Sequence, residues 1–158
     1  MTTRPLITCL WFDGNAVDAA HFYAEVFSGV KIGDTVRYPE GTPNAGEVMT
    51  VEFEINGQRF VGLNGGPHFK FNEAVSFQIF CDGQEEVDYY WDKLTADGGE
   101  ESQCGWLKDK FGVSWQVIPE QFHDYVTGPD PEGARRATQA MFGMRKLDVA
   151  ALRKAYEG

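Results

Sequence analysis

Trp106 and Lys108 are the residues of this sequence whose types and spacing best suit a ligand. They stand two apart in a segment that we predict to be a short strand, so their side chains point to the same face. An indole ring beside an ammonium group suits a planar anion such as an enolate, a phenolate or a carboxylate. Gln116, on the neighbouring predicted strand, would add an amide donor and acceptor to the same wall. The same pattern also describes an ordinary solvated sheet surface, and both interpretations stay open.

The histidines and cysteines give weaker indications of chemistry. His68 follows the loop sequence Gly65-Gly66-Pro67, where an imidazole could act as a base near neutral pH or have no role. Cys9, Cys81 and Cys104 are an odd number without a CxxC pair, which is typical of reduced thiols in a cytosol. We therefore expect a cytoplasmic protein, and no residue can be assigned a catalytic role.

The elements that must position these residues follow the order strand, helix, strand, strand, strand, and the order occurs twice. Helical spacing of apolar residues predicts one helix that includes residues 19–27 and a second that includes residues 87–94. The dipeptide Asn56-Gly57 predicts a tight hairpin in the first round. Alternation and turn residues predict strands at 6–12, 31–38, 48–55, 59–63, 74–81, 101–104, 106–110 and 113–118.

The two rounds can be superposed as an internal repeat. The turn Asp13-Gly14 corresponds to Asp82-Gly83, and Gly57 corresponds to Gly112. The second round is shorter, and the missing residues fall where the first carries its Pro- and Gly-rich loop, as expected for a surface deletion. Any two βα units share turns and amphipathic helices, but the recurrence of all elements in one order favours a duplication.

The sequence therefore predicts an α+β fold of two βαβββ modules, whose mostly antiparallel sheets form a cup-shaped cleft. We expect one domain over residues 1–158, with module one at about 5–66 and module two at about 74–119. A helical extension follows at about 120–158, with Asp130 and Asp148 as helix caps and Asn15 as the cap of the first helix. Exposed sheet edges favour a homodimer.

The composition excludes several classes of partner. The chain has 14 Lys and Arg against 24 Asp and Glu, a formal charge of -10 and a pI near 4.7. Such acidity argues against binding nucleic acids, which relies on basic residues, and against anionic membrane surfaces. No apolar run approaches the roughly 20 residues that span a bilayer.

Three longer strings resemble a known family. Residues 10–15 with Phe22-Tyr23, residues 65–73 and residues 105–116 resemble PhnB-like proteins of the 3-demethylubiquinone-9 3-methyltransferase type. These belong to the glyoxalase/bleomycin-resistance/dioxygenase (vicinal oxygen chelate) superfamily. The resemblance covers about residues 5–119. It implies the paired βαβββ fold and commonly a homodimer.

The resemblance also locates the positions at which the superfamily's metal enzymes place His, Gln or Glu, on the first and last strands of each module. Thr8 falls on the first-strand position, with Ser76 as its repeat partner. Gln116 falls on the last-strand position, with Val61 as its repeat partner. None of these is a His or a carboxylate, so we predict no metal and no other cofactor, and we keep Thr8 as a candidate substrate contact.

The methyltransferase label of the family can be tested against the sequence. An S-adenosylmethionine site in the common doubly wound fold needs a Gly-rich turn after the first strand and an acidic residue at the end of the next. Here Asp13-Gly14-Asn15 opens a single helix within an antiparallel pattern, so we treat the label as a family name.

Three hypotheses for function remain. The first is a metal-free cleft in each cup of a homodimer, which binds a small aromatic or anionic metabolite with or without an enzymatic step. The second is a non-catalytic protein that sequesters a cationic compound, for which the net acidity would be suitable. The third is a metal-dependent lyase or dioxygenase, which the missing ligands disfavour.

Overall fold

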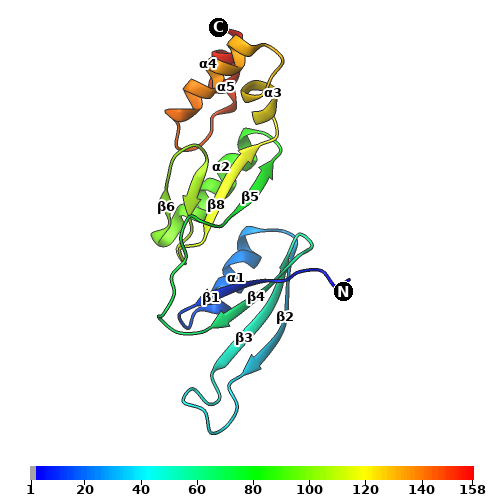
Figure 1. Ribbon diagram of the computed structural model, residues 1–158, viewed down its shortest axis with the longest axis vertical. Helices are drawn as coiled ribbons and strands as arrows, with labels where there is room; N and C mark the ends of the chain where they lie inside the picture. Colours follow the sequence, from blue (N-terminus) through cyan, green and yellow to red (C-terminus); the bar gives the residue numbers. More distant parts are fainter. Residues whose placement is uncertain (1–2) are drawn as a thin grey trace. The chain divides into compact units, whose positions relative to one another are not determined.

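Each half of the chain folds into a four-stranded sheet with a helix on one face (Figure 1). The computed structural model describes residues 3–158 and divides into two units, an N-terminal unit that ends at Phe71 and a C-terminal unit that begins at Asn72. The predicted α+β class with two βαβββ modules and C-terminal helices is confirmed.

The N-terminal sheet has the strand order β1-β4-β3-β2, in which β1 and β4 are parallel and the other neighbours are antiparallel. Its elements are β1 (Thr8–Phe12), α1 (Ala16–Val26), β2 (Val30–Arg37), β3 (Val48–Ile55) and β4 (Gln58–Asn64). The predicted hairpin is confirmed, since Asn56 and Gly57 join β3 to β4 with φ angles of 48° and 88°. Asn and Gly tolerate such positive φ angles, which the tight turn requires.

The cap of α1 differs from the prediction. Asn15 makes no side-chain capping hydrogen bond. Instead, Asn64 at the end of β4 accepts a hydrogen bond from the amide of Ala16 through Oδ1, at 2.9 Å. The free amide at the start of the helix is thus satisfied from a strand distant in sequence, which fixes α1 against the end of the sheet.

The C-terminal sheet repeats the arrangement with the order β5-β8-β7-β6, and β5 and β8 are its parallel pair. Its strands are shorter than those of the first sheet towards the β6 edge. The elements are β5 (Ser76–Cys81), α2 (Gln84–Thr95), the 3-10 turn η1 (Ala96–Gly98), β6 (Glu100–Glu101), β7 (Trp106–Lys108) and β8 (Ser114–Pro119).

Strand β6 is only two residues long, whereas the sequence predicted a strand at 101–104. The chain turns before Trp106 because Cys104 and Gly105 have φ angles of 57° and 83°. Their amides donate to the carbonyls of Met144 and Arg145, at 2.8 and 2.7 Å, instead of continuing the sheet. A segment from the C-terminal extension therefore replaces the expected end of this strand.

The extension consists of α3 (Phe122–Val126), α4 (Pro131–Phe142) and α5 (Val149–Glu157). Both predicted caps are confirmed: Asp130 accepts from the amides of Glu132 and Gly133, and Asp148 accepts from the amide of Ala151. In the described part of the chain, no helix combines the length and the apolar character needed to cross a membrane.

One side chain of module two forms two hydrogen bonds with the C-terminal extension. Gln84 at the start of α2 accepts a hydrogen bond from the amide of Val149 and donates one to the carbonyl of Leu147. Leu147 is itself buried in the C-terminal unit. The extension is thus part of the core of this unit.

Candidate functional site

The C-terminal sheet has one face covered by α2 and one face free of helices. Leu107 on β7 and Val117 on β8 are almost fully buried and belong to the covered face. Trp106 and Lys108, on either side of Leu107, therefore point to the helix-free face, as the spacing predicted.

Cross-strand register brings the predicted residues together on this face. Trp106 pairs with Gln116, and Gln116 pairs with Gln78 on β5, so these three side chains form one row across the sheet. Gln116 donates to Ser76 Oγ at 2.8 Å through Nε2. Its Oε1 accepts from Gln78 Nε2 at 3.4 Å. The side chain that was predicted to offer an uncharged donor and acceptor is thus held in place beside Trp106.

The next row carries the charges. Glu100 on β6 pairs with Lys108, Lys108 pairs with Ser114 on β8, and Ser114 pairs with Ser76. A carboxylate, an ammonium group and two hydroxyls therefore lie side by side across four strands. The structure thus assembles Trp106, Lys108 and Gln116, with three partners that the sequence did not single out as site residues: Glu100, Ser114 and Gln78.

Lys108 forms an ion pair with Glu73 at 2.5 Å, and Glu73 lies just before β5. The hydrogen bond to Glu73 raises the pKa of Lys108, with a smaller contribution from the charge of Glu100, and the same hydrogen bond lowers the pKa of Glu73. The carboxylate of Glu73 thus stabilises the charged form of the Lys108 ammonium.

A small hollow of about 100 Å³ lies beside these groups. Ser114 is 1% exposed, and its Oγ has no hydrogen-bond partner among the described residues. A buried hydroxyl without a partner costs free energy, so its position in the wall of a hollow marks a place for a polar ligand atom or a water molecule. The hollow is lined by Glu73, Glu100, Glu101, Ser102, Trp106, Leu107, Lys108 and Ser114.

The other two predicted site residues belong to the N-terminal unit. Thr8 pairs with the buried Phe60 and alternates with the buried Leu10 and Phe12, so it lies on the face of its sheet that packs on α1. This register gives no support to a ligand contact by Thr8 on the helix-free face. His68 is exposed in the loop after β4.

The register also corrects the predicted repeat partner of Thr8. Phe60 and Trp115 are equivalent positions of the two modules, and they pair with Thr8 and Phe77 respectively. The partner of Thr8 is therefore Phe77 and not Ser76. The sequence could not fix this single-residue slip, because it depends on how strands far apart in the chain align.

The cysteines do not contribute to the C-terminal site. Cys81 is fully buried, and burial raises its pKa to about 12, helped by the charge of Glu86. Cys104 is partly buried, and its Sγ lies 3.6 Å from the carbonyl of Met141. Neither thiol therefore has the exposed, electropositive surroundings of a nucleophile.

The residues at the positions that the resemblance assigns to metal ligands do not fit a metal of the usual kind. In the C-terminal unit these positions offer the hydroxyl of Ser76 and the neutral amide of Gln116, which pairs with Gln78. Over residues 3–158, no group of three or more His, Cys, Asp or Glu side chains is arranged to hold a metal ion.

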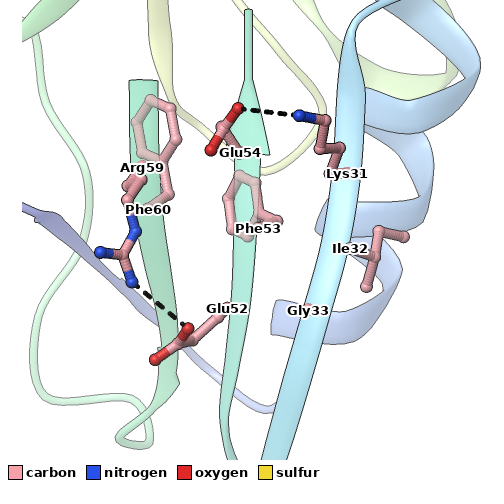
Figure 2. A pocket seen from close by; sticks show the side chains of 8 residues that line it. All are labelled: Lys31, Ile32, Gly33, Glu52, Phe53, Glu54, Arg59 and Phe60. Carbon is pink, nitrogen blue, oxygen red and sulfur yellow. Dashed lines mark ion pairs between the residues drawn. The ribbon is translucent and has the colours of Figure 1, made fainter. Parts of the chain in front are cut away.

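A second hollow, of about 150 Å³, lies on the N-terminal sheet (Figure 2). Two ion pairs cross it: Lys31 with Glu54 at 3.7 Å, and Arg59 with Glu52 at 3.6 Å. The four charged residues of its wall thus form two pairs of opposite sign, with no excess of either charge. A larger depression, of about 720 Å³, lies near Tyr38, and the acidic Asp13 and Glu47 are among its lining residues.

Comparison with known proteins gives two strong matches. The profile of the family described as 3-demethylubiquinone-9 3-methyltransferase matches residues 4–118. A solved structure described as a putative 3-demethylubiquinone-9 3-methyltransferase, PhnB protein, from Bacillus cereus is 32% identical, with a TM-score of 0.66. The match covers 73% of this chain and 99% of that one.

Two further solved structures share the fold at lower identity. Protein PA1353 from Pseudomonas aeruginosa is 19% identical, with a TM-score of 0.62 over 75% of this chain and 98% of that one. The fosfomycin resistance protein FosX from Listeria monocytogenes, complexed with Mn(II) and a sulfate ion, is 20% identical, with a TM-score of 0.51 over 74% and 92%. No curated protein matches the chain.

Proposed function

Because this chain belongs to the 3-demethylubiquinone-9 3-methyltransferase family of PhnB-like proteins, within the glyoxalase/bleomycin-resistance superfamily, we propose that it binds a small aromatic anion on the helix-free face of its C-terminal sheet. The family's methyltransferase name is not part of the proposal. Each sheet has a single parallel strand pair within an antiparallel arrangement, which is unlike the doubly wound sheet that commonly holds S-adenosylmethionine.

The observation that carries the proposal is the grouping of Trp106, Lys108 and Gln116 around one hollow or next to it. The indole offers a flat apolar surface, the ammonium offers charge, and the amide offers directed hydrogen bonds. The hollow is smaller than the few hundred Å³ of a typical drug-sized site. It therefore suits the anionic group of a ligand whose ring lies against Trp106.

The ion pair between Lys108 and Glu73 does not block such a ligand. The Glu73 side chain is 62% exposed and that of Lys108 is 31% exposed, so the pair is partly solvated. Exposed pairs are worth about 0–1 kcal/mol, which the charge-assisted bond from a ligand anion can offset. We expect Glu73 to move away when an anion binds.

The test begins with a screen in which thermal stability is measured against increasing concentrations of small aromatic carboxylates, phenolates and amines. For a ligand that binds, Trp106→Ala and Lys108→Met should each weaken affinity by roughly 1–2 kcal/mol, the scale of a lost stacking or charge-assisted contact. Tyr89→Ala and Lys93→Met change an aromatic and a cation that are exposed on α2, and they should leave affinity unchanged.

If neither Trp106→Ala nor Lys108→Met weakens a ligand that crystallography places on this face, the proposal is wrong. Incubation of the bound compound with the protein, followed by product analysis, then separates an enzyme from a binding protein. Both outcomes are compatible with the site.

The second candidate, sequestration of a cation, is favoured by one observation. Two carboxylates, Glu73 and Glu100, flank the single ammonium of Lys108. The variant Glu73→Gln separates the candidates, because it releases Lys108 and removes one negative charge. An anion should then bind more tightly, and a cation should bind more weakly.

A further inference from the structure

We propose that the ligand of this site is a zwitterion: an aromatic molecule that carries a carboxylate and an ammonium group on the same carbon, as in an aromatic α-amino acid. The inference rests on the proposed function and adds a cationic group to the aromatic anion proposed there. It follows from the charges of Glu100 and Lys108 and the buried hydroxyl of Ser114, which lie on one row, together with the charge of Glu73.

The first step concerns the excess of negative charge. Lys108 is already paired with Glu73, whereas Glu100 forms no ion pair with any other described residue. Glu100 also lines the hollow. A ligand that is only anionic would meet Lys108 but would also lie against an unneutralised carboxylate. A ligand with a cationic group can neutralise Glu100 at the same time.

The second step concerns distance. Glu100 and Lys108 are register partners on neighbouring strands, and such strands are about 4.7–4.9 Å apart. The site therefore offers opposite charges on adjacent strands of the same face. The carboxylate and ammonium of an α-amino acid are joined through one carbon, so both can reach their partners together.

The third step concerns Ser114, the register partner of Lys108 on the other side. Its buried Oγ lacks a hydrogen-bond partner in the described chain and borders the same hollow. A hydroxyl donates one hydrogen bond and accepts others. We expect it to donate to the carboxylate that Lys108 binds, which would give this buried hydroxyl a hydrogen-bond partner.

The test uses three probes that share a phenyl ring and differ only in their charged groups: phenylalanine, 3-phenylpropanoate and 2-phenylethylamine. Their affinities for the full chain are measured by titration calorimetry or by chemical-shift titration. We expect phenylalanine to bind about tenfold more tightly than either singly charged probe, since it alone engages both Lys108 and Glu100.

Two variants test which residues cause the tighter binding of phenylalanine. Glu100→Gln should lower the affinity for phenylalanine to that for 3-phenylpropanoate, without weakening the latter. Ser114→Ala removes an unpaired hydroxyl, so it should fold, and it should weaken both carboxylates by about threefold to tenfold and leave 2-phenylethylamine unchanged. The control Glu85→Gln makes the same charge change at an exposed position of α2 and should alter none of the affinities.

If phenylalanine and 3-phenylpropanoate bind with equal affinity and Trp106→Ala abolishes the binding of both, the result would support the proposed anion site but contradict a zwitterionic ligand. Phenylalanine binding that Glu100→Gln does not change would also overturn it. If none of the three probes binds, the inference is wrong, and the proposed function is then judged by the wider ligand screen alone.

Discussion

Asp109 is a buried carboxylate that holds the turn between the two strands of the site. It is 2% exposed, and it accepts hydrogen bonds from the amides of Phe111 and Val113 and from the indole of Trp115, at 2.9 to 3.1 Å. Lys108 precedes this turn and Ser114 follows it. The carboxylate therefore fixes the spacing of two ligand groups while it satisfies three donors.

We predict that Asp109→Asn lowers the free energy of unfolding by about 2–3 kcal/mol, because an amide cannot accept on both sides and leaves a buried donor facing a donor. Denaturation in urea measures the change. Asp97→Asn is the control, since Asp97 is exposed with a φ of 54°, which Asn also tolerates. Equal stability of the two variants would contradict this account of Asp109.

The thiols should differ in reactivity according to their burial. Cys9 is exposed, whereas Cys81 is buried with a pKa raised to about 12. Its thiol therefore stays protonated over the whole physiological pH range. Iodoacetamide at pH 8 should modify Cys9 first and leave Cys81 intact in the folded protein, and peptide mass spectrometry gives the order. Modification of Cys81 at the rate of Cys9 would show that β5 opens readily.

At the scale of elements, the contact between α2 and the extension should depend on pH. Lys146 lies 2.7 Å from Asp88, and the hydrogen bond from Lys146 lowers the pKa of Asp88, with a further contribution from Gln84. A carboxyl whose pKa is lower in the folded state stabilises the fold at neutral pH. That contribution is lost as the pH falls through the folded pKa, below about pH 4.

A double-mutant cycle of Asp88→Asn and Lys146→Met measures this pair. Because the two side chains are 45% and 37% exposed, solvent screens their interaction, and we expect a coupling of less than about 1 kcal/mol at pH 7. The coupling should decrease as the pH is lowered and Asp88 becomes protonated. A coupling that does not change with pH would show that charge does not hold this contact.

Local signals in the sequence predicted the elements well, and signals between distant elements were missed. Asn56-Gly57 and the cap at Asp130 depend on neighbouring residues, and both were predicted. The cap of α1 comes from Asn64, 48 residues after the Ala16 amide that it binds. Nothing near Asn64 in the sequence indicates that role.

In the candidate site too, features that depend on neighbouring residues were predicted, and features that depend on distant residues were missed. The alternation of Trp106 and Lys108 is local and predicted their shared face. The pairing of Lys108 with Glu100 depends on a strand of only two residues, too short to leave a periodic pattern. The buried state of Ser114 depends on what covers it, which the polar type of the residue does not reveal.

For the whole molecule, we predict a homodimer. Several large apolar side chains are exposed, among them Phe80 at 53% on the helix-free face of the C-terminal sheet and Val75 at 65% just before it. A face of this kind is stabilised by burial against another surface. Light scattering at micromolar concentration should give about twice 17.7 kDa. Since each chain carries a charge of -10, added salt should favour the dimer. A mass near 17.7 kDa at all salt concentrations would contradict the prediction.

The hydrogen bonds from Cys104 and Gly105 to the carbonyls of Met144 and Arg145 cross the end of the family match at residue 118. These two amides directly precede Trp106, and their solvent protection depends on a segment outside the matched region. Their rates of deuterium uptake therefore report on the docking of the C-terminal segment, residue by residue and without a probe. Any condition that releases this segment should therefore first increase deuterium uptake at Cys104 and Gly105, directly before the strand that carries Trp106.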